Sequence, residues 1–331
     1  MKDTEIQFPT DQATLSDRSA IVKTQCKGEF WKPCPGTING YLCCGYQILT
    51  PSTGCGMYCK FCILQAYFPY QCQVLYENFN DLEKEVEQKI SAKKFDVIRF
   101  GTGEFGDSLY SENHTGVACR TVEVLERYKN VILELKTKSN NIGNLKKIRS
   151  PQKVIIGFSM NTPEMIRVME KGTASLEARL EAARECEKMG FFVAFHFDPM
   201  FVYDNWEPEY REVVRRILDT IQDYKKIAWV SIGGFRTMPK LKQLLKKNGT
   251  HLPLFSGEMI TGDDGKLRYF RPLRVAMYKA MDNEFRKCSS EIPLYMCMES
   301  PEVWNESGMI SRIPNGLVRY LDNRAKEMLK I

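Results

Sequence analysis

Three closely spaced cysteines constrain this chain more than any other feature of its sequence. Cys55, Cys59 and Cys62 follow a C-x3-C-x2-C spacing, and the aromatic residue Phe61 precedes the third cysteine. Iron–sulfur clusters are held by cysteine thiolates, and a cubane cluster normally takes four of them. Three thiolates on one short loop leave one iron without a protein ligand, where a small chelating molecule can bind. The spacing therefore predicts a [4Fe-4S] cluster with one open coordination position.

Zinc is the alternative metal for such a loop. Zinc sites usually have four ligands in paired C-x2-C or Cys/His sets. The chain has only three histidines, none of them near the loop in the sequence: His114, His196 and His251. A fourth zinc ligand would have to be one of the neighbouring cysteines, Cys43, Cys44 or Cys72. The loop favours the cluster, while zinc stays open, as does a second cluster that uses Cys34, Cys43 and Cys44.

The composition is that of a globular protein with a substantial core. The 331 residues are 43% hydrophobic and 27% charged, which allows one large barrel or two ordinary domains. The first residues are polar, and no apolar run approaches the roughly 18 residues that a membrane helix needs. Twelve cysteines in such a chain argue for metal ligands and free thiols rather than disulfides. We therefore expect a cytoplasmic protein, whose net charge of +6 permits a phosphate-bearing ligand without requiring one.

Short apolar segments alternate with amphipathic ones from about residue 45 onward. Predicted strands cover residues 46–49, 97–100, 131–135, 154–158, 191–197 and 227–232, and predicted helices cover 80–91, 115–128, 175–189 and 209–224. Alternating strands and helices build parallel βαβ units. Six such strands predict an α/β fold with a partial (β/α)6 TIM-type barrel. A doubly wound open sheet is less favoured, because no glycine-rich dinucleotide fingerprint follows the first strand.

The pattern changes near residue 247. A predicted helix over residues 239–247 is followed by a turn signal at 262–265, a basic strand at 266–272, a helix at 273–288 and a last strand at 294–298. We therefore expect three parts: an N-terminal extension of irregular structure (residues 1–40), the barrel (41–247) and a C-terminal substrate-binding extension with a β-hairpin and a helix (248–331).

Functional groups of parallel α/β barrels gather at the C-terminal ends of the strands. Gly103 and Glu104 follow the second predicted strand, and a carboxylate there suits charge-assisted hydrogen bonds from an ammonium group. The next three strands end in further candidates, namely Lys136 with Lys138, Ser159 with Asn161, and His196 with Asp198. Polar residues after the third and fourth strands are also expected if these segments are simply solvent-exposed loops. A histidine between two phenylalanines is also typical of a satisfied core residue.

Basic residues concentrate in the C-terminal extension. Arginines alternate with aromatic side chains there, and another arginine follows the sixth strand; the set is Arg236, Arg268, Arg271 and Arg274. Guanidinium groups next to aromatic rings suit phosphates and bases. An ordinary solvated face shows the same composition, so nucleic-acid contact and simple exposure are both open interpretations.

The cysteine loop closely resembles that of the radical S-adenosylmethionine (SAM) enzymes. In that superfamily the methionyl amine and carboxylate of SAM occupy the open iron. The reduced cluster cleaves SAM to a 5′-deoxyadenosyl radical, which abstracts hydrogen from a substrate. The resemblance implies SAM as cofactor and a SAM site formed by Phe61, Gly103, Glu104, Lys136, Ser159 and Asn161.

The run C-x-x-x-C-x-F-C-I-L-Q that begins at Cys55 also resembles the spore photoproduct lyase family. Further segments at 159–162, 171–175, 179–183, 204–207 and 235–237 are similar to that family in order and spacing. The resemblance covers about residues 41–300. It implies repair of a thymine–thymine lesion in DNA and a partial barrel. It also implies a hairpin at about 265–278 that enters DNA, with a basic face made of Arg268, Arg271 and Arg274.

This chain departs from the lyase pattern in two respects, which involve three positions. The lyase has a hydrogen-returning cysteine after the second strand, where this chain has Glu104. The lyase also has tyrosines on both sides of the third cluster cysteine, where this chain has Phe61 and Ile63, which cannot relay a hydrogen atom. Cys297 and Tyr295, on the last predicted strand, are alternative hydrogen donors. We therefore expect a lyase-like relative whose exact reaction is open.

Three functional hypotheses follow. The preferred one is a radical SAM enzyme that acts on a DNA lesion or nucleotide and takes its electron from a reducing donor such as flavodoxin or ferredoxin. A radical SAM enzyme with a peptide or metabolite substrate is the second. The third is a non-catalytic, metal-stabilised nucleic-acid-binding protein, whose binding would weaken steeply with salt.

Overall fold

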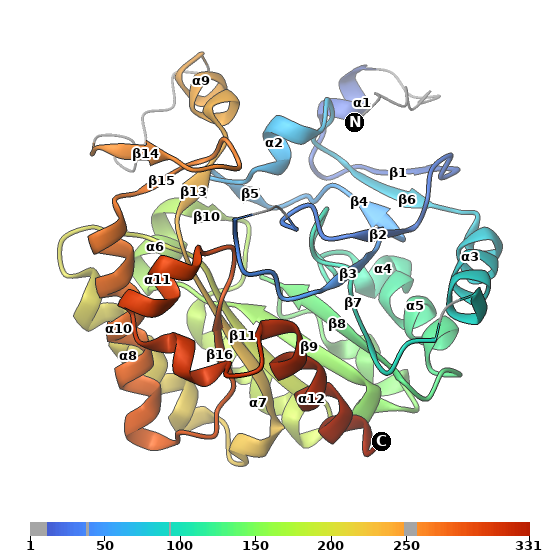
Figure 1. Ribbon diagram of the computed structural model, residues 1–331. Helices are drawn as coiled ribbons and strands as arrows, with labels where there is room; N and C mark the ends of the chain where they lie inside the picture. The colour runs from blue at the N-terminus through green and yellow to red at the C-terminus, as the bar shows by residue number, and fades with distance from the viewer. Residues whose placement is uncertain (1–11, 38–39, 93, 248–256) are drawn as a thin grey trace.

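The structure is a computed structural model that describes residues 12–37, 40–92, 94–247 and 257–331. Its main sheet consists of β2 (Trp31–Pro33), β3 (Gln47–Leu49), β7 (Ile98–Gly101), β8 (Val131–Thr137), β9 (Val154–Ser159), β11 (Phe192–Met200), β12 (Ile227–Gly234) and β16 (Leu294–Met296). The strands lie in the order β16-β12-β11-β9-β8-β7-β3-β2. Only the edge strand β2 pairs in the antiparallel direction. The sheet curls into a partial barrel (Figure 1), which confirms the predicted fold class.

The barrel strands are buried because both faces of the sheet are covered. Every residue of β9 and of β12 is buried, and so is all but one residue of β8. Parallel strands covered on both faces read as near-continuous apolar runs, which is why these segments were recognisable in the sequence. The predicted strands therefore agree with the observed ones to within a few residues at each end.

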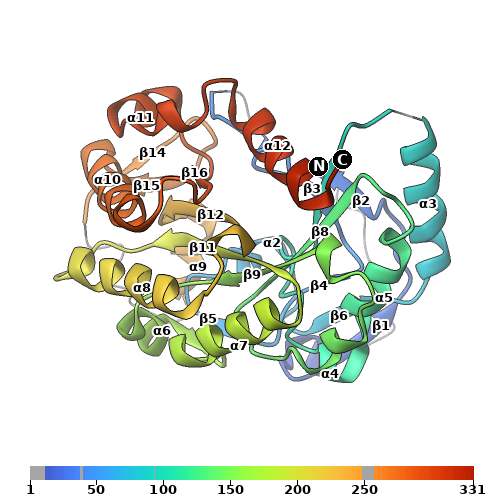
Figure 2. The same cartoon turned by 90° about the horizontal axis from the view of Figure 1, so that it is seen from below.

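Helices cover the outer face of the sheet (Figure 2). They include α3 (Phe79–Ala92), α4 (Glu112–Thr115), α5 (Val117–Leu125), α6 (Pro163–Met169), α7 (Leu176–Lys188), α8 (Trp206–Thr220), α10 (Arg271–Cys288), α11 (Pro301–Glu306) and α12 (Leu317–Leu329). Short 3-10 helices lie at Gly143–Lys147, Pro151–Lys153, Tyr224–Lys226 and Met309–Arg312. The predicted helix at 115–128 is divided at Gly116, which has a φ of 63° and separates α4 from α5.

Smaller elements gather above the C-terminal ends of the barrel strands (Figure 1). One sheet joins β1 (Ile21–Thr24), β6 (Gln73–Tyr76) and β4 (Ser52–Thr53); a second joins β5 (Tyr58–Cys59) and β10 (Glu170–Lys171); a third joins β13 (Arg236–Thr237), β15 (Leu267–Tyr269) and β14 (Met259–Thr261). Three helices complete this layer, namely α1 (Gln12–Ser16), α2 (Leu64–Tyr67) and α9 (Pro239–Lys247). These elements are the walls of the site described below.

Several boundaries differ from the sequence-based expectation. The N-terminal extension is not irregular throughout, because β1 and β2 belong to it and β2 pairs with barrel strand β3. The last strand, β16, pairs with β12 and so extends the barrel sheet. The hairpin consists of β14 and β15, whereas residues 271–278 form the first turns of α10. The three-part division stays a prediction, and residues 1–11 and 248–256, with His251, lie outside the described residues.

A buried charged network joins three strands of the barrel. Glu134 on β8 accepts hydrogen bonds from His196 Nε2 on β11 at 2.5 Å and from Trp229 Nε1 on β12 at 3.2 Å. A side chain at Gly157 would meet the Glu134 carboxylate at 2.6 Å, so glycine makes room for it. His196 is therefore a satisfied core residue. In the described part of the chain, no helix has the length and apolar character needed to cross a membrane.

Candidate functional site

A large cavity of about 1580 Å³ opens at the C-terminal ends of the barrel strands. It is lined by the cysteine loop, by the loop that follows β7, and by residues at the C-terminal ends of β8, β9 and β11. Residues of the N-terminal segment and of α9 form its outer rim. This is the end of a parallel barrel where active sites lie.

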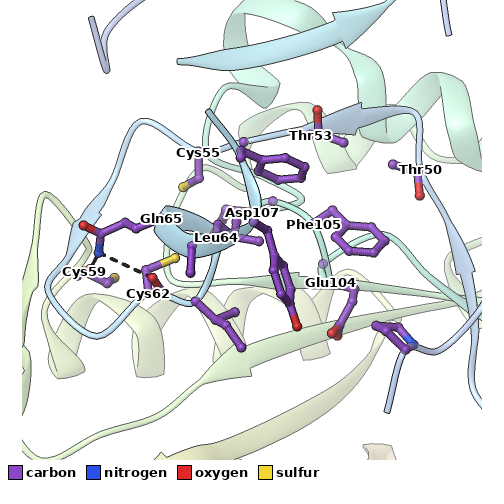
Figure 3. Close-up of a pocket in the computed structure, with 18 of the residues that line it drawn as sticks. Thr50, Thr53, Cys55, Cys59, Cys62, Leu64, Gln65, Glu104, Phe105 and Asp107 are labelled. Carbon is purple, nitrogen blue, oxygen red and sulfur yellow. Dashed lines mark hydrogen bonds between the residues drawn. The ribbon is translucent and has the colours of Figure 1, made fainter. Parts of the chain in front are cut away.

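The three predicted cluster cysteines line one side of this cavity (Figure 3). The Met57 backbone N–H donates to Cys55 Sγ at 3.4 Å. The Gln65 amide donates to the carbonyl oxygens of Cys59 at 3.1 Å and of Cys62 at 3.4 Å. Gln65 thereby closes the loop on itself and holds the backbone at two of the three cysteines.

Burial raises the pKa of all three thiols. At Cys55 the Asp107 carboxylate adds to the rise, whereas at Cys59 the Lys138 ammonium opposes it. Bound metal deprotonates a coordinating thiol, so desolvated thiols of this kind suit a cationic metal centre. Within the described residues no three His, Cys, Asp or Glu side chains are grouped tightly enough to hold one metal ion, and the ligand role of the cysteines stays a prediction.

The cysteine loop is joined to the loop that follows β7. The Gly54 N–H donates to the Phe105 carbonyl at 2.8 Å, and Gly54 and Gly106 form an isolated parallel bridge. Asp107, which sequence reasoning missed, ties the same loop to the end of β8. Its carboxylate accepts from the Thr137 hydroxyl and from the Lys138 N–H, both at 2.7 Å. Thiols and strand-end residues are thereby held in one rigid frame.

Glu104 lies across the cavity from the cysteines (Figure 3). Its side chain forms no hydrogen bond or ion pair within the part of the chain that the structure describes, and its residue is exposed to the cavity. Gly103 is required by packing, because a Cβ there would lie 2.5 Å from the Lys136 Cβ. An unpaired carboxylate in a cavity is suited to accept hydrogen bonds from a ligand ammonium group.

Lys136, on β8, and Lys138, directly after β8, have different surroundings in the cavity. Lys138 lies near the cysteines: its ammonium is 3.9 Å from Glu170 and 5.7 Å from the centre of the Phe61 ring. The charge of Lys136 instead helps to lower the pKa of Asp198. Both lysines line the cavity, as do Phe61 and Ser159.

Asn161 does not line the cavity. It is 1% exposed, and its amide oxygen accepts a 2.6 Å hydrogen bond from the Tyr210 hydroxyl. Its amide nitrogen donates to the Pro199 carbonyl at 3.5 Å. The side chain thus has internal partners on α8 and β11, which differs from the predicted role in the SAM site.

Asp198 and Arg236 also line the cavity, at the C-terminal ends of β11 and β12, and their part of the cavity is called the far side below. Their side chains are 3.3 Å apart, and Arg236 also donates to the Cys297 sulfur at 3.4 Å. Burial opposes ionisation of Asp198, but Arg236 and Lys136 outweigh it and lower the pKa of the carboxyl. Cys297 and Tyr295 are not themselves part of the lining, and burial raises the pKa of both.

The expected basic face of the hairpin is only partly present. The Arg268 side chain is 3% exposed, is paired with Asp264 and stacks on the Tyr41 ring at 4.7 Å. Arg274 is likewise buried and is paired with Glu299. Arg271 is 48% exposed and lies 3.5 Å from Glu306. Two of the three arginines thus stabilise the C-terminal part from inside, because each has an acidic partner that the local sequence pattern does not reveal.

Cationic side chains do line the cavity, but from other segments. Lys240 and Lys247 project from α9, and Lys266 comes from the hairpin. Lys27 and Lys32 line the rim from the N-terminal segment. Sequence analysis missed these residues because nothing in their local pattern indicates that their segments meet. None of Cys43, Cys44 and Cys72, the considered fourth zinc ligands, belongs to the lining.

Comparison with known proteins finds spore photoproduct lyases among the proteins similar to this chain. A family model described as spore photoproduct lyase matches residues 44–249, more than half of the chain. The spore photoproduct lyase of Clostridium acetobutylicum is 28% identical over 210 residues, which are 63% of this chain and 62% of that protein. The enzyme of Bacillus subtilis is 23% identical over 199 residues, 60% of this chain and 58% of that protein. The chain thus matches less than two thirds of these relatives' length.

Solved structures agree in fold. A spore photoproduct lyase mutant with bound AdoMet and dinucleoside spore photoproduct superposes with a TM-score of 0.76 at 19% identity, covering 88% of this chain and 87% of that one. A second mutant of the lyase gives a TM-score of 0.75 and covers 85% and 83% of the two chains. The expected family resemblance is thereby confirmed.

Proposed function

Because the chain belongs to the spore photoproduct lyase family, we propose that it is a radical SAM enzyme acting on a nucleotide or a DNA lesion. In this proposal Cys55, Cys59 and Cys62 hold a [4Fe-4S] cluster whose fourth iron takes SAM. When bound, the cluster and SAM would supply a 5′-deoxyadenosyl radical, and the protein's part is to bind, orient and shield the reactants.

One observation carries this proposal. Three desolvated thiols and an unpaired carboxylate, Glu104, face each other across one cavity at the C-terminal end of a parallel barrel. The thiols suit a cluster, and the carboxylate suits the methionyl ammonium of SAM. The shared frame through Gly54 and Phe105 keeps the two halves of this site at a fixed separation.

Lys138 is better suited than Lys136 to the methionyl carboxylate of SAM. A methionyl group on the open iron must lie beside the cysteine loop, and Lys138 is the lysine whose charge acts on Cys59 and Cys62. Glu170, which lies 3.9 Å from the Lys138 ammonium, is also paired with Arg179 at 2.6 Å. The nearby Asp107 carboxylate accepts from the Thr137 hydroxyl and the Lys138 backbone N–H. The ammonium is therefore available to a further anion. Ser159, beside this group in the lining, is a candidate for the ribose hydroxyls.

The far half of the cavity supports a phosphate-bearing substrate. Arg236, Lys266, Lys240 and Lys247 bring cationic groups to its wall, against the carboxylate of Asp198. Guanidinium and ammonium groups bind phosphate oxygens through charge-assisted hydrogen bonds. The relative of known structure with bound dinucleoside spore photoproduct supports a nucleoside-containing substrate, and the cationic wall is our reason for adding the phosphate.

The lyase has its hydrogen-donating cysteine at the position where this chain has Glu104. We propose Cys297 as the hydrogen-atom donor in its place. Its thiol lies under the cavity wall, in contact with Arg236 and next to Asp198. A substrate carbon radical would break the Cys297 S–H bond, form a C–H bond and leave the unpaired electron on sulfur. Tyr295, two residues earlier on β16, is the alternative donor.

The experiment is release of 5′-deoxyadenosine by anaerobically reconstituted, reduced protein supplied with SAM. It is run with DNA containing spore photoproduct, with undamaged DNA and without DNA. Lesion-stimulated release with recovery of thymine supports the lyase reaction with an unfamiliar donor. Slow release that ignores the lesion supports SAM cleavage but transfers the search to other substrates. A protein that binds DNA in a salt-dependent manner and never cleaves SAM contradicts the proposal.

A further inference from the structure

The cysteine loop has an outer side that faces away from the cavity. Met57 and Cys59 belong to the cavity lining, whereas Tyr58 and Lys60 do not. This alternation follows from the extended backbone at β5, because successive side chains of a strand point to opposite sides. Lys171 shares the outer side with Tyr58, since the two residues pair directly in the antiparallel β5–β10 ladder.

Arg18 lies at the edge between this outer side and the cavity, because it also belongs to the cavity lining. Its guanidinium stacks on the Tyr58 ring, with 4.2 Å from Cζ to the ring centre, and donates to the Met57 carbonyl at 3.2 Å. Tyr58 is 41% exposed, so its ring is accessible to a partner. Arg18, Tyr58, Lys60 and Lys171 are called the outer patch below.

The outer patch has an excess of positive charge. Arg18, Lys60 and Lys171 form no salt bridge within the described residues, while the acidic neighbour on β10, Glu170, points inward to Arg179 at 2.6 Å. The one carboxylate beside Arg18 in the sequence is Asp17, which accepts hydrogen bonds from the backbone N–H and hydroxyl of Ser19 at 2.8 and 2.7 Å. Lys60 and Lys171 are thus left without an acidic partner on the outer side, and Arg18 adds a third positive charge at its cavity edge.

We propose that the outer patch is the docking surface for a small acidic electron-transfer protein. The inference rests on the proposed function, because a radical SAM centre must receive one electron from a reduced donor, which is left one electron more oxidised. Tyr58 and Lys60 flank Cys59, a predicted cluster ligand, so a protein seated here lies beside the cluster loop. The cavity stays free for SAM and substrate, which a donor docked at the cavity mouth would block.

Charge complementarity is the recognition principle for such a pair. Opposite charge on the two surfaces raises the association rate at low ionic strength, and salt removes the effect. Exposed aromatic and arginine side chains are also the residue types that interfaces favour. The proposed partner is therefore a flavodoxin- or ferredoxin-type protein with an acidic rim around its redox centre.

The test is the rate at which reduced flavodoxin reduces the reconstituted cluster of the Lys60→Glu/Lys171→Glu variant. We expect at least a tenfold slower reduction than in the wild type at low salt, with the two rates converging at high salt. Reduction by photoreduced deazaflavin, a small reductant, is expected to be equal in both proteins. Lys225→Glu/Lys279→Glu, with the same change of charge far from the cysteine loop, is the matched control. Equal iron content of all proteins excludes a folding defect.

Two results overturn the inference alone. One is a cluster-bearing Lys60→Glu/Lys171→Glu variant that flavodoxin reduces as fast as the wild type. The other is the same unchanged rate of cluster reduction by flavodoxin in a variant that also binds DNA more weakly than the wild type. That result would mean that the patch binds a nucleic acid. A wild-type protein that holds no cluster is a different result, because it overturns the proposed function and this inference with it.

Discussion

The backbone N–H of Gly54 donates a hydrogen bond of 2.8 Å to the carbonyl oxygen of Phe105. This bond joins the first residue before the cluster cysteines to the residue after Glu104. The two functional loops follow different strands, and the bond makes their separation a property of the fold. A ligand that spans from the thiols to Glu104 therefore meets a preformed site.

Gly54 itself cannot be replaced without strain. Its φ is 75°, and a Cβ would lie 2.2 Å from the Cys72 carbonyl oxygen. We predict that Gly54→Ala lowers the free energy of unfolding by about 1 kcal/mol or more and reduces the iron content after reconstitution. Gly143→Ala is the control, because a Cβ there meets nothing closer than 3.7 Å. If Gly54→Ala is as stable as the wild type and binds as much iron, the proposed connection between the cysteine loop and the loop after β7 is contradicted.

Glu104 is predicted to contribute to SAM binding through its charge. Glu104→Gln keeps the shape of the side chain and removes the negative charge. A lost charge-assisted hydrogen bond raises the dissociation constant of SAM about tenfold to a hundredfold. Equilibrium dialysis with the cluster-loaded protein measures it, and Glu29→Gln at the cavity rim, where Glu29 pairs with Lys89 at 3.2 Å, is the control. An unchanged dissociation constant of SAM in Glu104→Gln would mean that groups other than Glu104 bind the methionyl ammonium.

Substitutions of Cys297 and of Tyr295 distinguish which of the two residues donates the hydrogen atom. If Cys297 is the donor, Cys297→Ala still releases 5′-deoxyadenosine but returns no hydrogen atom, so restored product falls to background. Tyr295→Phe is then expected to keep most of the product. Product analysis by mass spectrometry after single-turnover reaction measures both. Full product from Cys297→Ala would eliminate the thiol, and loss of product in Tyr295→Phe would transfer the role to the phenol.

The interface of α8 and α10 gives the protein an acid-sensitive element. Glu284 is 4% exposed and accepts from Arg211, Arg215 and Lys287 at 2.9, 3.1 and 2.7 Å. Burial opposes its ionisation, but the three cations outweigh burial and lower the pKa of the carboxyl to about 2, from an ordinary 4.5. A lowered folded-state pKa stabilises the protein above pH 4.5, and this stabilisation is lost as the pH falls toward about 2.

We therefore predict that Glu284→Gln loses on the order of 2 kcal/mol of unfolding free energy at pH 7. The difference from the wild type is expected to shrink as the pH falls below 4.5. Urea unfolding at a series of pH values measures it. Glu181→Gln, in an exposed pair with Arg184 at 2.6 Å, is the control and is expected to change little. A difference that is the same at every pH would contradict the assignment to this charge.

The barrel could be predicted from the sequence because its signal is local. Strands such as β9 are apolar over their whole length, so the predicted residues 154–158 nearly coincide with Val154–Ser159. The edge strand β2 was missed because Lys32 and Pro33 are exposed and only Trp31 is buried. Its pairing with β3 depends on residues more than a dozen positions away, which no local pattern contains.

In the candidate site too, features with a local sequence signal could be predicted, and features that depend on distant residues could not. The spacing of the cysteines is local, and their shared position in the cavity agrees with it. Arg268 and Arg274 were expected at the surface, but the acidic partners that draw them inward, Asp264 and Glu299, are not distinguishable in sequence from solvated residues. Lys138 and Lys136 are alike in sequence, but Lys138 lies near Glu170 and the Phe61 ring, whereas the charge of Lys136 acts on Asp198.

Iron and acid-labile sulfide content of the anaerobically reconstituted protein tests the central claim most directly. The account predicts about four irons and four sulfides per chain in the wild type and in Cys288→Ala, whose cysteine is exposed and outside the cavity lining. Cys59→Ala is predicted to lose the cluster. One zinc per chain in place of iron, or a Cys59→Ala protein that retains the full cluster and cleaves SAM, would contradict the account.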